Sequence, residues 1–371
     1  MIAKFEVKNF KNFNDWFSFD LTDTKQYTFK PECVNNGIVS KALVYGPNGV
    51  GKSNLGFAML DITMHLKDRP PISKSYDNYL PIGSEENLAE FKYHFVFGED
   101  EVTYEYGKSN WDELIYESLA INSQVVLQYD RRGEGRIATI ELKGAESLKK
   151  DMGDSQISLI TYVRNSSILD ENKQNELFRK FLKQVDGILF FRSLKDYSSI
   201  GVQPAYKTLN EYLTWEGNVD NLQDFLAQAG IDCKLEIVEN DDKPQLMFVS
   251  NGKKVPFAHI ASTGTASLCI FYFWLKQLES NPNISFIFID EFDAFYHHDL
   301  SKLVVNSLNK LPAQIVLTTH NTSIMSNDIL RPDCYFLMGQ ERIGSLANRT
   351  PKELRSAHNI EKMYRAGAFN G

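Results

Sequence analysis

Three short and largely apolar runs are widely spaced along the chain. They cover residues 41–45, 284–289 and 314–318. Such runs are typical of strands that are buried on both faces of a parallel sheet. Segments with helical patterns follow them at 54–60 and 300–311, and a strongly apolar helix is predicted over 263–278. The pattern therefore predicts an α/β fold with a parallel sheet covered by helices.

Other segments alternate strictly between apolar and polar positions. The alternation is clearest at 91–97 and 102–106, on either side of a turn at Gly98, and it continues at 113–119 and 124–129. This is the pattern of antiparallel strands with one buried face. We predict an antiparallel β subdomain here, and residues 1–45 are also rich in β-type patterns.

Residues 145–230 have a different character, with dense charged and amide side chains. Their apolar residues recur at helical spacing: Leu177, Phe178, Phe181, Leu182, Val185, Ile188 and Leu189. At 371 residues the chain exceeds the size of about 250–300 residues at which single cores stop growing. We therefore expect an N-terminal part at 1–144, a mainly helical insertion at 145–230 and a C-terminal part at 231–371.

Composition limits the setting of the protein. No apolar run approaches the roughly 18 residues of a membrane span, and the N-terminus lacks the plan of a signal peptide. The four cysteines are far apart, without a CxxC pair, which favours a reducing cytoplasm. The net charge of −8 argues against coating of nucleic acid by the whole surface, although a local basic patch is compatible with it.

The strand predicted at 41–45 leads into GPNGVGKS, which fits the phosphate-loop pattern GxxxxGK[ST] at every fixed position. The alternative is an ordinary glycine turn before a helix. In a phosphate loop, backbone N–H groups and the positive end of the helix hold phosphates, while Lys52 reaches the β- and γ-phosphates and Ser53 ligates Mg²⁺. ATP and Mg²⁺ are the expected cofactors. The predicted nucleotide-binding residues are Gly46, Pro47, Asn48, Gly49, Val50, Gly51, Lys52, Ser53 and Asn54.

Polar residues follow the two later apolar strands. Asp290 and Glu291 end the run at 284–289, where ligands bind in open α/β sheets. Behind a phosphate loop, Asp290 is expected to hold Mg²⁺, and Glu291 is expected to orient or deprotonate the attacking water. His320 ends the next strand and can hydrogen-bond the γ-phosphate. His297 and His298 form a pair with no cysteine or carboxylate at metal spacing, which disfavours a zinc site.

A further candidate is the segment Ser262-Thr263-Gly264-Thr265, which precedes the apolar helix. Hydroxyl and backbone N–H groups at a helix start suit phosphate well. Taken alone, the segment is better explained as a simple helix N-cap.

The ordered set GPNGVGKSN, STGT, IFIDEFDAFYH and TTHNT resembles the ATP-binding heads of the ABC/SMC/RecF class. Within that class the chain is most similar to bacterial AAA-type, OLD-like ATPases without a Toprim domain, of the kind found in anti-phage defence systems. The resemblance implies a P-loop NTPase head with a mixed central sheet flanked by helices. It also implies that two subunits sandwich two ATP molecules. It assigns Ser262, Gly264 and Thr265 to the partner's γ-phosphate, Asp293 to the dimer seam and His320 to the switch position. Phe295 and His298 depart from the family pattern.

These observations predict a slow cytoplasmic ATPase that forms a homodimer or a higher homo-oligomer through its ATP sites. In this hypothesis the insertion is a lever or docking arm, and the ATPase controls a separate toxic effector. The main alternative is a RecF- or SMC-like ATPase that binds DNA in repair or maintenance. A transporter subunit is disfavoured because STGT is far from the transporter consensus, and Glu291 disfavours binding without turnover. We expect no membrane association.

Overall fold

The computed structural model describes residues 1–67, 76–133, 136–153, 155–191, 200–201, 208–240, 243–294 and 297–369. Its central sheet has the strand order β11-β15-β16-β5-β17-β18. Neighbouring strands run parallel except for the antiparallel pair β17–β18. The strands are β5 (Lys41–Tyr45), β11 (Ile188–Phe191), β15 (Phe286–Ile289), β16 (Gln314–Thr319), β17 (Tyr335–Met338) and β18 (Ile343–Ser345). The predicted mixed central sheet is confirmed, and its apolar runs form β5, β15 and β16.

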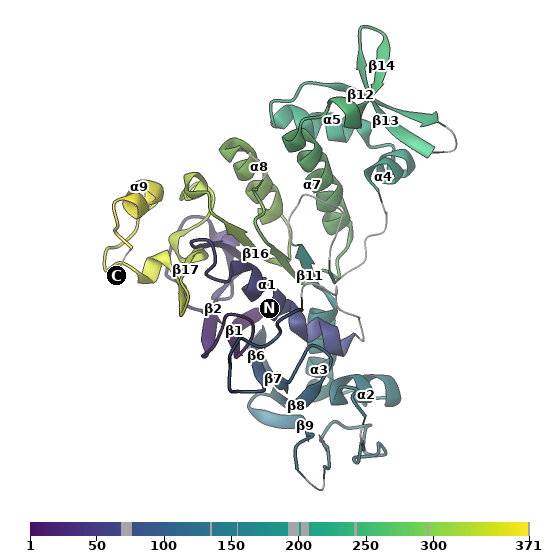
Figure 1. Cartoon of the computed structure of the whole chain (residues 1–371), viewed down its shortest axis with the longest axis vertical. Helices are drawn as coiled ribbons and strands as arrows, with labels where there is room; N and C mark the ends of the chain where they lie inside the picture. Colours follow the sequence, from purple (N-terminus) through teal and green to yellow (C-terminus); the bar gives the residue numbers. More distant parts are fainter. Residues whose placement is uncertain are drawn as a thin grey trace.

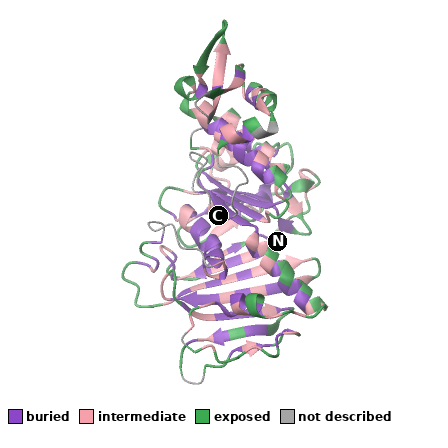
Figure 2. Ribbon diagram, turned by 90° about the vertical axis from the view of Figure 1, so that its right-hand side faces the viewer, coloured by how far each residue is buried: buried purple, intermediate pink, exposed green. Residues whose placement is uncertain are grey.

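A second, antiparallel sheet has the order β10-β9-β8-β7-β6-β1-β2. Buried and partly exposed positions alternate along β6, as expected for a strand with one face on the core. The strands are β1 (Ile2–Lys8), β2 (Phe17–Asp20), β6 (Ala89–Phe97), β7 (Asp100–Lys108), β8 (Leu114–Ile121), β9 (Gln124–Asp130) and β10 (Thr139–Ile140). The predicted antiparallel subdomain corresponds to β6 through β9, and Figure 2 shows its buried positions in alternation along the lower sheet.

Helix α1 (Lys52–Leu66) lies between the two sheets and is buried over most of its circumference. Gly56 faces the central sheet so closely that a Cβ atom there would lie 2.6 Å from the Phe288 ring. On the opposite side, the Tyr93 hydroxyl of β6 donates a hydrogen bond of 2.7 Å to the Ala58 carbonyl. Helix α1, which follows the glycine loop, is therefore held in place by contacts with both sheets.

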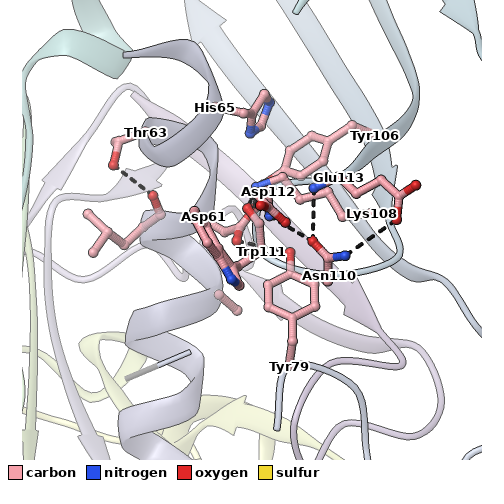
Figure 3. A network of polar contacts seen from close by, with 12 residues as sticks. Asp61, Thr63, His65, Tyr79, Tyr106, Lys108, Asn110, Trp111, Asp112 and Glu113 are labelled. Carbon is pink, nitrogen blue, oxygen red and sulfur yellow. Dashed lines mark hydrogen bonds and ion pairs between the residues drawn. The ribbon is translucent and has the colours of Figure 1, made fainter. Parts of the chain in front are cut away.

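A buried ion pair fastens the middle of α1 to β7 (Figure 3). The Lys108 Nζ lies 2.8 Å from Asp61 Oδ1, and both side chains have no exposed surface. The hydroxyls of Tyr79 and Tyr106 each donate to the same carboxylate at 3.0 Å. Because every oxygen of Asp61 has a partner, the charge is compensated inside the protein.

A smaller lobe projects from the central sheet at one end of the molecule (Figure 1). It contains α4 (Leu209–Glu216), α5 (Val219–Gln228), α6 (Phe257–Ile260) and a three-stranded sheet of β12 (Lys234–Asn240), β13 (Lys243–Ser250) and β14 (Lys253–Pro256). Helix α7 (Thr263–Ser280) runs from this lobe back to the central sheet.

The remaining elements surround the two large sheets. The helices are α2 (Leu159–Ser166), α3 (Lys173–Asp186), α8 (His298–Asn309) and α9 (Ile360–Arg365). The short pieces are β3 (Val34–Asn35), β4 (Ile38–Val39) and the 3₁₀ turns Pro31–Cys33, Thr322–Ile324, Pro332–Cys334 and Leu346–Asn348. Among the described residues, no helix is long and apolar enough to cross a membrane.

One expectation for the insertion is wrong in detail. Ile188 and Leu189 do not extend the preceding helix, because α3 ends at Asp186. They begin β11, which pairs in parallel with β15 at the edge of the central sheet. Segment 145–230 therefore contributes α2 and α3 beside the large sheets, β11 to the central sheet, and α4 and α5 to the lobe. The domain boundaries at 145 and 230 stay a prediction.

Candidate functional site

The glycine loop joins β5 to α1 and needs glycine at specific points. A Cβ atom on Gly46 would lie 2.6 Å from the Met338 carbonyl oxygen of β17. Gly49 and Gly51 have φ values of 81° and 102°, in the left-handed region that favours glycine. Gly51 is also the N-cap of α1, so the loop ends at the positive end of the helix. The local structure is the strand, loop and helix that the motif requires.

Lys52 lies inside this loop and is 6% exposed. Its Nζ donates to the carbonyls of Gly46 at 2.8 Å and Pro47 at 3.1 Å. Burial lowers the pKa of this ammonium group, and the charges of Asp290 and Glu291 oppose that shift. The cation is thus held at the centre of the loop, where it can contact a bound phosphate.

Asp290 lies directly beyond the end of β15, beside the start of α1. The Ser53 hydroxyl donates to its Oδ2 at 2.5 Å, and the Thr318 hydroxyl of β16 donates to its Oδ1 at 2.5 Å. Burial raises the pKa of Asp290, while these two hydrogen bonds act in the opposite direction. The structure thus brings together Ser53 and Asp290, the two predicted metal-binding residues.

Glu291 and His320 face each other at the same edge of the central sheet. The Glu291 backbone N–H donates to the Thr318 hydroxyl at 2.8 Å, and the φ of Glu291 is 43°. Its carboxylate Oε1 lies 4.0 Å from His320 Nε2, and both side chains are substantially exposed. A left-handed φ is uncommon for glutamate, and such conformations cluster at functional sites. The two predicted catalytic side chains are therefore adjacent and open to solvent.

The Asp293 carboxylate is hydrogen-bonded to a residue of its own chain. The Thr319 hydroxyl lies 2.8 Å from both of its carboxylate oxygens, and burial raises its pKa. The same hydroxyl accepts the Asn321 N–H at 2.9 Å, so Asp293 is linked to the segment that follows His320. Phe295 lies outside the described residues, so its departure from the family pattern has no structural counterpart here.

The Ser262–Thr265 segment does not meet the glycine loop of its own chain. Ser262 is the N-cap of α7, where its hydroxyl accepts the Thr265 N–H at 3.1 Å. An 18-residue helix is about 27 Å long, and the N-terminus of α7 is its lobe end (Figure 1). Ser262 is exposed, and Gly264 and Thr265 are partly exposed. The predicted site residues therefore form two groups on one chain.

The donor set around Ser53 and Asp290 fits Mg²⁺, which prefers hydroxyl, carboxylate and phosphate oxygens. The other candidate cluster is His297, His298 and Asp299, at the start of α8. The expectation that no carboxylate accompanies this pair is wrong, because Asp299 lies 3.4 Å from His298 and 3.8 Å from His297. His297 and Asp299 are exposed, so the cluster lacks the enclosure of a built site, and we assign no metal to it.

Parallel β5, β15 and β16, the glycine loop after β5 and the acidic pair after β15 decide the fold. It is a P-loop NTPase fold. Residues 169–326 match the AAA_21 family, described as "AAA domain, putative AbiEii toxin, Type IV TA system". This match includes the acidic pair and His320 and begins after the glycine loop, and it supports an AAA-type domain in this part of the chain. The comparison with curated proteins gave no match.

Several solved structures of SMC heads are similar to the whole chain. The SMC head domain from Thermotoga maritima is 14% identical, with 95% of this chain and 99% of that chain covered and a TM-score of 0.42. An SMC head with a coiled coil and joint from Pyrococcus yayanosii is 12% identical, with coverage of 98% and 99% and a TM-score of 0.46. An SMC head bound to the C-winged helix domain of ScpA is 16% identical, with coverage of 93% and 97% and a TM-score of 0.45. At these scores the fold assignment rests on the strand order and the loop.

Two residues of the site were not found by sequence reasoning. Thr318 connects Asp290 to Glu291, and its only signal is a polar residue at the end of an otherwise apolar run. Asn12, from the turn after β1, hydrogen-bonds to the glycine loop. Nothing in the local sequence indicates that contact, because it joins segments about forty residues apart.

Proposed function

We propose that the protein is an ATP-binding and ATP-hydrolysing switch whose two copies close head to head on ATP. The observation that carries this proposal is the cluster of Lys52, Ser53, Asp290, Glu291 and His320 at one edge of the central sheet. It unites a phosphate loop, oxygen ligands for a cation and an exposed carboxylate beside a histidine. Those are the groups that phosphoryl transfer to water requires.

Each residue has a role in this proposal. Loop N–H groups and Lys52 bind the β- and γ-phosphates, and Ser53 and Asp290 hold Mg²⁺, which neutralises charge on the phosphates. Glu291 accepts a proton from the attacking water. His320 hydrogen-bonds the γ-phosphate. Its Nε2 lies 4.0 Å from Glu291 Oε1, so both side chains can act on the same γ-phosphate.

The second copy supplies what the first site lacks. The exposed Ser262, Gly264 and Thr265 lie at the lobe end of α7 and are proposed to contact the γ-phosphate held by the partner. Asp293 would lie beside that seam. ATP then contacts both chains only in the closed dimer, so its differential affinity shifts the population towards closure and hydrolysis reverses the shift.

We further propose that this switch controls a separate toxic effector in a bacterial defence system. The description of the AAA_21 family names a putative toxin and a type IV toxin–antitoxin system, which supports a setting of this kind. The insertion at 145–230 is the proposed lever or docking arm, and its helices α4 and α5 lie in the lobe that projects from the central sheet.

The test compares the wild type with Glu291→Gln in ATP turnover and in oligomeric state. Because a general base typically contributes 10²–10⁴-fold, turnover by the variant is expected to fall by about a hundredfold or more. The variant should accumulate as an ATP-bound dimer or larger species in light scattering. Glu171→Gln, an exposed glutamate far from the site in the sequence, is the matched control and should resemble the wild type.

Two results would contradict the proposal. If both chains stay monomeric with ATP and turn over at similar rates, Glu291 is not the base and no second site is completed. If the ATP-bound dimer instead binds duplex DNA with a steep dependence on salt, the defence switch is replaced by the DNA-maintenance alternative.

A further inference from the structure

The turn after β1 presents a rigid tip to the glycine loop. Phe10 and Phe13 are buried and pair through two backbone hydrogen bonds of 3.1 and 2.8 Å, with Lys11 and Asn12 between them. Lys11 is fixed from behind, because its N–H donates to the Tyr79 carbonyl at 2.9 Å. The position of the tip is therefore set by buried aromatic rings and backbone contacts that do not involve the Asn12 side chain.

The Asn12 side chain reaches both the loop and helix α1. Its Nδ2 donates to the Val50 carbonyl at 3.2 Å, and its Oδ1 accepts from Asn54 Nδ2 at 2.6 Å. Between these two contacts it covers Gly51, where any Cβ atom would collide with the Asn12 amide. One side chain thus bridges the last turn of the loop and the first turn of the helix.

These contacts fix the direction of a peptide group. In a planar trans peptide the carbonyl of one residue and the N–H of the next point in opposite directions. Since the Val50 carbonyl is held by Asn12, the Gly51 N–H must point away from the turn. Loop N–H groups directed in this way are the ones that can receive phosphate oxygens.

We propose that Asn12 is a positioning residue that holds the phosphate loop in its binding conformation before nucleotide arrives. The inference rests on the proposed nucleotide-binding function and adds a residue outside the loop motif. A loop that is ordered in advance loses less conformational entropy on binding, so removal of this side chain should weaken affinity. The effect should be common to ADP and ATP, because the loop contacts phosphates that both nucleotides carry.

The experiment measures the affinities of Asn12→Ala for ADP and for ATP with Mg²⁺ by calorimetry, together with KM and kcat. The loss of one or two hydrogen bonds predicts affinities weaker by about 3- to 10-fold for both nucleotides. KM should rise by a similar factor while kcat stays within about twofold of the wild type. Asn14→Ala is the matched control, because Asn14 is an exposed asparagine two residues further along the same turn.

A double-mutant cycle with Asn54→Ala separates positioning from general damage. If Asn12 acts through Asn54 and the loop, the double variant should lose less affinity than the product of the two single losses. Unchanged affinities for both nucleotides in Asn12→Ala would overturn the inference. So would a fall in kcat at constant KM, which indicates a smaller fraction of folded enzyme. If the wild type itself binds neither nucleotide, the proposed function fails and the inference falls with it.

Discussion

At the scale of single residues, two opposing effects act on the charge of the Asp290 carboxylate. It is buried, which disfavours its charge, yet it is the predicted ligand for a cation. Two hydroxyl donors, from Ser53 and Thr318, support the carboxylate from different elements. These donors only partly offset burial, since the pKa of Asp290 remains above its usual value. A bound cation would therefore stabilise the charged form of this carboxylate.

This raised pKa predicts a pH dependence of cation-assisted binding. The charged carboxylate binds Mg²⁺, so protons compete with the metal as pH falls through the raised pKa of Asp290. Mg²⁺-dependent ATP affinity should therefore begin to weaken at a higher pH than the ordinary aspartate value of about 3.9 implies. Calorimetry across an acidic pH series, with and without Mg²⁺, measures the difference.

The Asp290→Asn variant is the control for that series, because its side chain does not titrate. It should bind Mg²⁺–ATP more weakly and with little further change over the same pH range. If the Mg²⁺-dependent affinity of the wild type stays level down to a pH of about 4, Asp290 does not titrate as described.

At the scale of elements, the strands and helices that carry the site follow from local patterns. The runs that form β5, β15 and β16 are mostly apolar and buried at every position, and the glycine loop fits a fixed pattern. The four-residue strand β11 was missed, because a short apolar run after a helix looks like its continuation. The contacts of Asn12 and Thr318 were missed for another reason. They depend on which elements become neighbours, and that information is spread over the whole chain.

The ion pair between α1 and β7 gives a prediction about an element rather than the active site. Lys108→Met leaves the Asp61 carboxylate buried with two tyrosine hydroxyls and no cation. Breaking a buried pair in this way typically costs 3–5 kcal/mol, so about that loss of unfolding free energy is expected. Urea unfolding, followed by circular dichroism, measures it as a lower midpoint.

Lys92→Met is the matched control on the neighbouring strand β6. Its ion pair with Glu105 is partly exposed and should contribute only about 0–1 kcal/mol. Equal midpoints for the two variants would show that the Asp61–Lys108 pair does not fasten α1 to the antiparallel sheet. The double variant Asp61→Asn with Lys108→Met should recover part of the loss, because no uncompensated charge remains.

At the scale of the whole molecule, the site residues form two groups that lie in different parts of one chain. The phosphate loop lies at the edge of the central sheet where β5 ends, while the Ser262–Thr265 segment lies at the lobe end of α7. In the proposed function, one chain therefore carries two half-sites. A pair of chains related by a two-fold axis can complete both sites at once.

Trans completion predicts that two inactive variants restore each other when mixed. Lys52→Ala removes the phosphate-binding cation, and Gly264→Asp places a carboxylate against the partner's γ-phosphate. An acidic residue in the first turn of α7 is favourable for the helix dipole, so Gly264→Asp should fold normally. Random pairing makes half of the dimers mixed, and each mixed dimer has one intact site. Turnover in the mixture should then reach roughly a quarter of the wild-type rate if the sites act independently.

The control replaces one partner by the double variant Lys52→Ala with Gly264→Asp. Mixed dimers of that chain with Gly264→Asp contain no intact site, so no turnover should return. If Lys52→Ala mixed with Gly264→Asp also stays inactive while both chains still dimerise, each site depends on residues of its own chain only. Because Lys52 and Gly264 belong to different groups of site residues, recovery in the mixture requires the Ser262–Thr265 segment of one chain to meet the phosphate loop of the other.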